Sequence, residues 1–244
     1  MNSDNQIESW NTSYLNGDNH LFYPSEEVVR FAAKYIRKRI QLNKFLDIQK
    51  DLRNFRILDL GCGIGRHHIY FESLGVSCFG IDLSARAIEL AQKWSSDEGI
   101  SQKSSKLIQG DLRSLPYSNQ YFDCAISVGV FDSMHYSVAK QCIPELWRVL
   151  KEDSLLYVDL ISMNSEIPKD EKPTQSRRNS KENEEIIVKT LHEKDTIQSY
   201  YNIEKIQGLF CGYFEILEHW ENIRRDFMNE KQQSRHGLVL KRVR

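Results

Sequence analysis

Long apolar segments are missing from this sequence. No run approaches the ~20 apolar residues that cross a bilayer. The polar stretch from Met1 to Trp10 also lacks the basic region followed by an apolar one that marks a signal peptide. We therefore expect a soluble, cytoplasmic protein that does not contact membranes.

Paired cysteines and an excess of one charge are missing as well. The five cysteines are scattered and form no C-x-x-C pair, so neither a disulfide framework nor a metal site is indicated. Lys and Arg number 33 against 34 Asp and Glu. Because a protein that binds a long phosphate backbone needs a cationic face, this balance argues against a nucleic-acid partner, although a local basic patch stays open. Nothing in the sequence indicates an oligomeric state.

What the sequence does contain is a regular alternation of short apolar runs with helical segments. Its 244 residues, 40% of them apolar, suit one α/β domain. We predict three helices: one over 65–74, one that starts at Ser84, and one that ends near Leu150. We predict strands over 56–60, 76–82, 106–109, 122–128 and 155–161. This alternation predicts a doubly wound, Rossmann-like α/β fold with a mostly parallel sheet and helices on both faces.

The segments on either side of this core are less regular. Ser25, followed by two glutamates, predicts a helix that continues to about Phe45. Prolines and polar residues in 163–185 predict a flexible insertion. Beyond it we predict a strand over 186–191, a helix over 202–210, and a final antiparallel hairpin of 213–220 and 237–243 joined by the charged stretch 221–236.

A glycine-rich loop, Asp59-Leu-Gly-Cys-Gly-Ile-Gly-Arg66, lies where the first core strand passes into a helix. Open α/β sheets bind nucleotides at this position, and glycines there let the backbone approach a ligand closely. Asp82 ends the second strand about 20 residues later, where a carboxylate binds ribose hydroxyls; a helix-capping acid is the alternative. Asp111, after the third strand, either accepts from an adenine amino group or is an ordinary loop residue.

The spacing of the glycines distinguishes two kinds of cofactor. Dinucleotide-binding folds use G-x-G-x-x-G and direct a helix N-terminus at a pyrophosphate. Here the spacing is G-x-G-x-G, and Asp59 would repel a phosphate. The pattern favours a phosphate-free ligand with a cationic amino-acid tail and disfavours a nicotinamide-dependent dehydrogenase.

Several stretches, in this order, resemble the class I S-adenosylmethionine-dependent methyltransferases. They are Ile57 to Arg66, Gly80-Ile-Asp-Leu-Ser84, Gln109-Gly-Asp-Leu112, Tyr121-Phe-Asp-Cys-Ala-Ile-Ser-Val128 and Trp147-Arg-Val-Leu-Lys151. The Gly-Arg-His sequence that follows the glycines is similar to the small-molecule branch of the family. In one place the sequence differs from the family, because Glu152-Asp153-Ser154 stands where two glycines are often found, and we expect a changed turn there.

The resemblance implies a seven-strand sheet with an antiparallel last strand, and S-adenosylmethionine as cofactor. It also implies that Gly61, Cys62 and Gly63 contact the methionine part of the cofactor. Asp82 and Leu83 would contact the ribose and the adenine edge, Asp111 and Leu112 would contact the adenine, and Ser127 would lie beside the sulfonium. We add Asp59, Arg66 and Trp10 to the predicted cofactor-binding residues. The chain is thereby divided into a lid and helix (1–54), a cofactor-binding core (55–162), the insertion (163–185), and the rest of the sheet with substrate-side elements (186–244).

Methyl transfer from a sulfonium needs a nucleophile held in line, and a base only where the acceptor keeps its proton until late. His135, after the fourth strand, is our candidate for a catalytic base or substrate ligand; a polar residue at a helix start is the alternative. Asp132 is either a helix cap or a base. The Pro-Pro-Tyr motif of DNA and protein-amide methyltransferases is absent from this segment.

Aromatic residues before the core predict an N-terminal lid. We expect Trp10 to cover the cofactor, and the substrate to contact Tyr14, Tyr23, Phe131 and His135. His67 and His68 either face the substrate or line the core, and Arg177 and Arg178 either bind an anionic substrate or belong to a solvated loop. The sequence thus favours a methyltransferase acting on a hydroxyl, carboxylate or amine of a small molecule. An RNA-modifying enzyme and an S-adenosylmethionine-binding protein without turnover are the alternatives.

Overall fold

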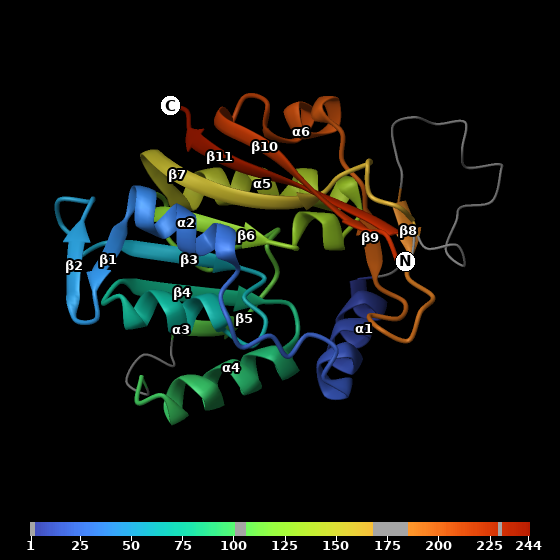
Figure 1. Ribbon diagram of the computed structural model, residues 1–244, viewed down its shortest axis with the longest axis horizontal. Coiled ribbons are helices and arrows are strands. Elements are labelled where there is room, and N and C mark those ends of the chain that lie inside the picture. The colour runs from blue at the N-terminus through green and yellow to red at the C-terminus, as the bar shows by residue number, and fades with distance from the viewer. Residues whose placement is uncertain (1–2, 101–105, 168–184, 229–230) are drawn as a thin grey trace.

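A seven-strand sheet forms the centre of the computed structural model, which describes residues 3–100, 106–167, 185–228 and 231–244 (Figure 1). The spatial order of its strands is β10, β11, β7, β6, β3, β4, β5. In chain order they are β3 (Arg56–Leu60), β4 (Ser77–Asp82), β5 (Leu107–Gln109), β6 (Phe122–Val128), β7 (Leu150–Ile161), β10 (Phe214–Asp226) and β11 (Lys231–Arg242).

The pairing of these strands is mostly parallel. All neighbours from β7 through β6, β3 and β4 to β5 pair in parallel, whereas β11 runs antiparallel to both β7 and β10. The predicted sheet with an antiparallel last strand is confirmed. After β3 the chain places β4 and β5 on one side and β6 and β7 on the other. Open α/β sheets bind ligands beside the carboxyl ends of the strands at such a switch point.

Helices cover both faces of the sheet, which confirms the predicted Rossmann-like architecture. They are α1 (Ser3–Asn16), α2 (Glu26–Tyr35), α3 (Arg66–Ser73), α4 (Ala85–Asp97), α5 (Tyr136–Val149) and α6 (Ile203–Phe210). Side chains alternate along a strand, so Ile57 of β3 joins the core under α2 and α3, while Leu58 joins the core under α5 and α6. Both side chains are fully buried.

Polar caps start three of these helices where the sequence placed them. The hydroxyls of Ser25 and Ser84 accept from backbone amides in the first turns of α2 and α4. The side chain of Asn202 does the same for α6. Each cap satisfies a backbone donor that has no partner inside the helix.

Helix α2 ends at Tyr35 and does not continue to Phe45, so that prediction was wrong. The following residues form an antiparallel hairpin of β1 (Arg37–Gln41) and β2 (Lys44–Asp47). Arg37 anchors it, because its guanidinium lies over the Phe45 ring and donates to the Leu74 carbonyl at 2.5 Å. These contacts with distant residues outweigh the local helical pattern.

Residues 152–154, where we expected a changed turn, lie within strand β7. Strand β7 begins at Leu150 and runs through them, with a register shift against β6 between Phe122 and Cys124. Asp153 has the left-handed φ of +60° that usually selects glycine. Its carboxylate lies 2.7 Å from the Lys241 ammonium on neighbouring β11.

The C-terminal hairpin is longer than predicted. Residues 221–226 and 231–236 belong to β10 and β11, so the paired strands extend into the charged connection. Glu221 stabilises this extension by accepting hydrogen bonds from the Ser162 and Ser234 hydroxyls at 2.5 and 2.6 Å. These contacts are not evident from the charged sequence itself.

A further group of elements lies at the carboxyl ends of the parallel strands of the main sheet. Helix α1, which was not predicted, lies there beside a small sheet of β8 (Glu185–Ile187) and β9 (Ile197–Ser199) (Figure 1). The predicted strand over 186–191 is thus shorter and outside the main sheet. The core of the predicted insertion, 168–184, with Arg177 and Arg178, lies outside the described residues. Among the helices of the described ranges, none combines the length and apolarity needed to cross a membrane.

Candidate cofactor and substrate site

A cavity of about 630 Å³ opens beside the glycine loop, between the carboxyl ends of β4, β6 and β7 and helix α1. This volume lies within the range of small-molecule sites. The following predicted cofactor-binding residues line the cavity: Gly61, Cys62, Gly63, Arg66, Asp82, Leu83, Asp111, Leu112 and Trp10. Of the predicted substrate residues, Tyr14 and His135 line it.

The glycine loop is shaped for close approach. Gly61 and Gly63 have left-handed φ angles of +58° and +54°. A Cβ at Gly61 would lie 2.5 Å from Val130, and one at Gly63 would lie 2.7 Å from the Tyr14 hydroxyl. Only glycine adopts these angles freely, and its lack of a Cβ lets Val130 and Tyr14 pack closely against the loop.

Asp82 fixes the loop from the end of β4. Its two carboxylate oxygens accept from the amides of Gly63 and Ser84, each at 2.9 Å. Burial raises the pKa of Asp82 to about 6, although these hydrogen bonds act in the opposite direction. Asp82 can thus line the cofactor site and also support the start of α4, so the two roles predicted as alternatives are compatible.

Asp111 and Leu112 line the cavity beside Asp82, just after the neighbouring strand β5. Arg113 binds both carboxylate oxygens of Asp111, and its amide donates to the same carboxylate. Burial alone would raise the pKa of Asp111, but these hydrogen bonds outweigh it, and the pKa is lowered. An ionised, fixed acceptor at this place suits the amino group of an adenine ring.

Helix α1 closes the cavity over the glycine loop. Trp10 and Tyr14 lie with ring centroids 6.4 Å apart and pack with Ile64. Asn11 ties the helix down, because its side-chain oxygen accepts from the Ser84 hydroxyl at 2.7 Å. Burial raises the pKa of Tyr14 well above its ordinary value, so its hydroxyl stays protonated.

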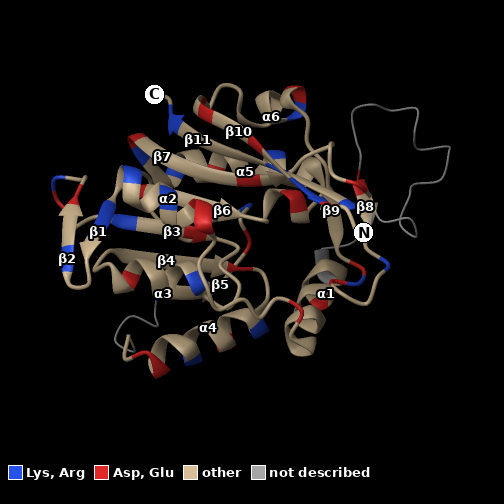
Figure 2. Cartoon of the chain, in the orientation of Figure 1, with Lys and Arg blue, Asp and Glu red and all other residues tan. Residues whose placement is uncertain are grey.

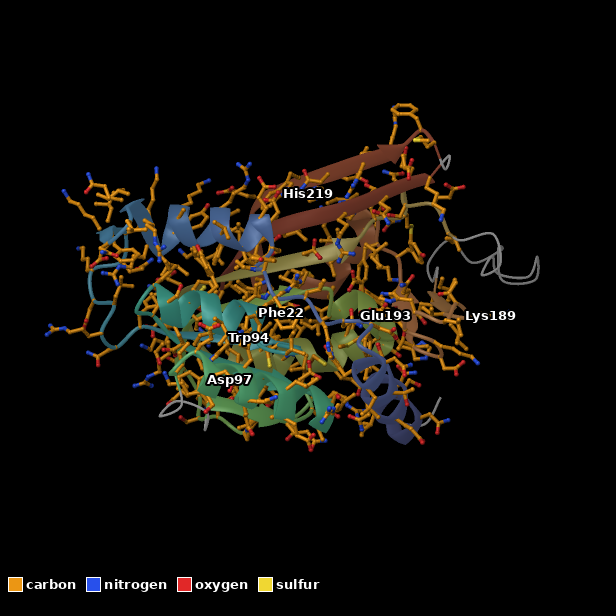
Figure 3. All side chains as sticks on the ribbon, turned by 60° about the horizontal axis from the view of Figure 1, so that its bottom comes forward. Phe22, Trp94, Asp97, Lys189, Glu193 and His219 are labelled. Atoms are coloured by element: carbon orange, nitrogen blue, oxygen red, sulfur yellow. The ribbon has the colours of Figure 1, made fainter. Side chains whose placement is uncertain are left out.

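Two further contacts hold this N-terminal cover. The Phe22 ring packs edge-on against Trp94 of α4, with centroids 5.1 Å apart (Figure 3). On the other side, the amide of Glu193 donates to the Asp18 carboxylate at 3.1 Å. Glu193 itself lines the cavity. The prediction of a cover built from residues before the core is compatible with this arrangement.

Arg66 supplies a cation to the cavity. Its guanidinium makes no hydrogen bond or ion pair with any residue in the described part of the chain, and burial lowers its pKa. Asp59 does not reach the cavity surface, because it is buried below His67, with 3.7 Å between Asp59 Oδ1 and His67 Nδ1. His67, which lines the cavity, accepts from the Ser25 amide through Nε2.

A charged cluster forms the far wall. Arg235 of β11 binds both carboxylate oxygens of Asp159 on β7 and donates to Asp132 Oδ2 at 2.7 Å. Asp132 is almost fully buried, and burial raises its pKa to about 6 despite the neighbouring guanidinium. Its other oxygen, Oδ1, is buried without a hydrogen-bond partner.

His135 begins α5 and belongs to a second polar group. Its Nδ1 lies 2.6 Å from Glu185 Oε2, while Glu185 Oε1 accepts from the Tyr136 amide at 2.7 Å. Burial would raise the pKa of Glu185, but the hydrogen bonds from His135 and Tyr136 lower it. The predicted residue thus has a carboxylate partner that the sequence did not reveal.

The structure places four predicted residues away from the cavity surface. Asp59 lies behind His67, Ser127 is fully buried with an unpartnered hydroxyl, Phe131 is buried against Phe210, and Tyr23 is 85% exposed. His68 is buried in the core, where its Nδ1 lies 2.8 Å from the Cys78 carbonyl oxygen.

The polar residues missed in the sequence include Asp159 and Arg235, which line the cavity, and Glu185, which contacts His135. Asp159 had a usable signal, because it is the single charge in the apolar run Leu155–Ile161. Arg235 and Glu185 stand in charged stretches that carry no such signal.

The half of the cavity beside the glycine loop, here called the near half, fits S-adenosylmethionine. Gly61 and Gly63 line this part of the cavity with backbone alone, Asp82 offers a buried carboxylate to hydroxyl donors, and the unpaired Arg66 suits a ligand carboxylate. The polar and charged groups of this half therefore suit an adenosyl amino acid.

Comparison with known proteins gives the same result. Residues 58–158 match the family model for a methyltransferase domain. The uncharacterized methyltransferase YcgJ of Bacillus subtilis (strain 168) is 30% identical over 105 residues, which are 43% of this chain and 40% of YcgJ. Norajmaline N-methyltransferase of Rauvolfia serpentina is 30% identical over 120 residues, which are 48% of this chain and 39% of that protein. The chain thus spans about two fifths of each of these relatives.

A solved structure extends the likeness to the fold. The S-adenosylmethionine-dependent methyltransferase from Methanosarcina mazei superposes with a TM-score of 0.64 at 20% identity, covering 78% of this chain and 93% of that one. The matched segment contains the glycine loop, Asp82 and Asp111. Residues 58–158 thus form a methyltransferase domain, and the fold is similar to that of class I, Rossmann-like S-adenosylmethionine-dependent methyltransferases.

Proposed function

We propose that this protein transfers the methyl group of S-adenosylmethionine to a hydroxyl, carboxylate or amine of a small molecule. One observation carries the proposal: a single cavity joins the cofactor-binding loop to a second polar wall of Asp132, His135 and Arg235. The second wall provides groups that bind an acceptor beside the cofactor.

The bound cofactor would supply a methyl group on a good leaving group, the sulfonium. The protein then has to hold the acceptor in line and exclude water. Trp10 and Tyr14 provide an apolar cover for this purpose, and Arg235 and Asp132 fix the opposite wall. Cys62 takes no part as a nucleophile, because burial raises the pKa of its thiol well above the ordinary value.

Two observations favour a small acceptor. Helix α1 and the Glu193 loop border the cavity, which limits the size of a ligand that enters. Figure 2 shows Lys and Arg interspersed with Asp and Glu along the elements, and a long phosphate backbone would favour a face with one sign of charge. The name of the relative norajmaline N-methyltransferase supports the same class of acceptor.

Ligand binding tests the cofactor half of the proposal. S-adenosylmethionine and S-adenosylhomocysteine should raise the melting temperature and NAD should not, because a ligand at 100 times its Kd stabilises the folded state by about 2.7 kcal/mol. Asp82→Ala should abolish the shift. Asp97→Ala is the matched control, since Asp97 is an exposed acid at the end of α4 (Figure 3).

Transfer of a tritiated methyl group into fractionated cell extract tests the acceptor half. We expect label in the small-molecule fraction. Label confined to RNA would replace the proposal with an RNA-modifying activity. Cofactor binding without transfer into any fraction would indicate a binding protein that has no turnover.

A further inference from the structure

The His135 ring is held in one orientation by a carboxylate. Glu185 reaches it from β8, 50 positions away in sequence, and contacts Nδ1 at 2.6 Å. An ionised carboxylate only accepts hydrogen bonds, so Nδ1 carries the proton and the neutral ring keeps its lone pair on Nε2. Nε2 has no hydrogen-bond partner in the part of the chain that the structure describes, and His135 lines the cavity.

The Glu185 carboxylate is itself fixed. Its second oxygen accepts from the Tyr136 amide at the start of α5, where the helix dipole also favours a negative charge. Nearby, the Ser199 hydroxyl of β9 donates to the Met134 carbonyl at 2.6 Å, which ties β9 to the segment before His135. The small β8–β9 sheet therefore positions the imidazole.

Four other titratable groups of the cavity are less suited to remove a proton. Asp159 and Asp132 Oδ2 are bound by Arg235, and Asp132 Oδ1 is buried. Both oxygens of Asp82 accept from backbone amides. The hydroxyl of Tyr14 is kept protonated by burial. Among the described residues of this cavity, His135 combines a free lone pair with a carboxylate partner.

We propose that His135 is the general base of the methyl transfer, that Glu185 is its positioning residue, and that the acceptor is a hydroxyl group. This inference rests on the proposed function. An ionised carboxylate acceptor has no proton to lose and would be repelled by Glu185, and a neutral amine attacks before it loses a proton. A hydroxyl keeps its proton until late and needs the base.

The reaction balances without another reactant. The acceptor oxygen forms a bond to the methyl carbon as the carbon–sulfur bond breaks, and that electron pair stays on sulfur. The hydroxyl proton passes to His135 Nε2. Glu185 stabilises the resulting imidazolium, which returns its proton to water when the products leave.

The first test needs no acceptor. Nitrogen-15 NMR of the protein labelled at histidine should show neutral His135 as the Nδ1–H tautomer, and Glu185→Gln should weaken this preference. Glu204→Gln is the matched control, because Glu204 is an exposed acid in the first turn of α6 and should leave the signal unchanged. An Nε2–H tautomer in the wild-type protein would overturn the proposal.

The second test measures transfer of labelled methyl groups to small-molecule extract and to a series of substituted phenols. His135→Asn should lower kcat about 10²- to 10⁴-fold and leave S-adenosylhomocysteine affinity within about twofold. The loss should be greatest for the least acidic phenols and small for a nitrophenol that is already ionised. Glu185→Gln should lower kcat about tenfold or more, with the same dependence on acidity.

Failure of this inference can be distinguished from failure of the proposed function. Wild-type protein that binds S-adenosylhomocysteine and forms only N-methyl or ester products would overturn the hydroxyl assignment alone. An equal loss with every phenol would reduce His135 to a structural residue, and full activity of His135→Asn with none for Asp132→Asn would move the base to Asp132. Absence of cofactor binding would instead reject the proposed function.

Discussion

The Tyr14 hydroxyl of α1 lies over Gly63 of the glycine loop, so close that a Cβ on Gly63 would come within 2.7 Å of it. This contact joins the cover to the cofactor loop. Gly63→Ala should therefore lower the free energy of unfolding by about 1–2 kcal/mol, because alanine disfavours φ near +54°. It should also weaken S-adenosylhomocysteine binding at least about tenfold, as measured by titration calorimetry.

Gly99→Ala separates the two effects. Gly99 also has a left-handed φ, +72°, but a Cβ there would meet no atom of the described residues within 4 Å. We expect a similar loss of stability and unchanged ligand affinity. Combining Gly63→Ala with Tyr14→Phe should recover part of the stability, since the clashing oxygen is gone. Wild-type affinity in Gly63→Ala would show that the loop does not approach the ligand.

Cofactor affinity should depend on pH through Asp82. Burial raises its pKa to about 6, so the carboxylate is ionised above this pH and protonated below it. Hydroxyl donors bind the ionised form, and S-adenosylhomocysteine affinity should fall up to about tenfold between pH 7 and pH 5. Calorimetry across this range should show the fall in wild-type protein and a flat profile in Asp82→Asn. Asp132→Asn should keep the fall.

The same shift has the opposite sign for the stability of the unliganded protein. The folded state binds the Asp82 proton more tightly than the unfolded state, whose carboxyl titrates near 3.8. The contribution of Asp82 to stability is therefore complete below about pH 4 and is lost as pH rises through about 6. Urea denaturation of wild type and Asp82→Asn at pH 4 and pH 7 should show this difference, and a constant difference would contradict it.

The sequence predicted the segments whose secondary structure is determined by their own residues, and it failed where distant residues determine it. The runs at Ile57, Ile81 and Ile126 are buried strands with apolar neighbours on both faces, and periodicity identifies such strands. The hairpin after Tyr35 and the extension past Glu221 depend on distant partners, Leu74 and Ser234, which no local pattern contains. The helical pattern before Phe45 therefore gave a wrong prediction of a helix beyond Tyr35.

The same distinction holds for the site. Most residues predicted for the cofactor half lie at the ends of β3, β4 and β5, where the local sequence pattern marks the end of each strand, and most of them line the cavity. The far wall is assembled from β7, β11 and β8, which lie far apart in the chain. Arg235 reaches the site through the pairing of β11 with β7, and Glu185 through the separate β8–β9 sheet, so neither was predictable from spacing.

Removing the Arg235 guanidinium should destabilise the far wall. In Arg235→Ala, the carboxylates of Asp132 and Asp159 lose their counter-ion, and we expect a loss of about 2–4 kcal/mol at pH 8 in urea denaturation. The loss should be smaller at pH 5, because Asp132, whose pKa is already raised to about 6, then takes up a proton.

Two variants control this experiment. Arg225→Ala removes an exposed guanidinium of β10 that donates to Gln232, and should change stability by no more than about 0.5 kcal/mol. Adding Asp159→Asn to Arg235→Ala should restore part of the loss, because one unpaired charge is removed. A double variant that is less stable than Arg235→Ala would show that the cluster acts through packing alone.

Helix α1 should control how long the cofactor stays bound. Asn11 accepts from the Ser84 hydroxyl at 2.7 Å, and Ser84 follows Asp82 by two residues, so this bond fastens the cover to the strand that carries the buried carboxylate. Asn11→Ala should raise the S-adenosylhomocysteine dissociation rate about three- to tenfold, in line with the net 0.5–1.5 kcal/mol of one hydrogen bond. The association rate should change little, since an open cover does not obstruct entry.

Ser9→Ala is the control on the same helix, because the Ser9 hydroxyl donates only to the Asn5 carbonyl one turn earlier. Stopped-flow displacement would show equal rates in all three proteins if α1 were not a cover, and a slower release from Asn11→Ala would mean that the helix hinders binding.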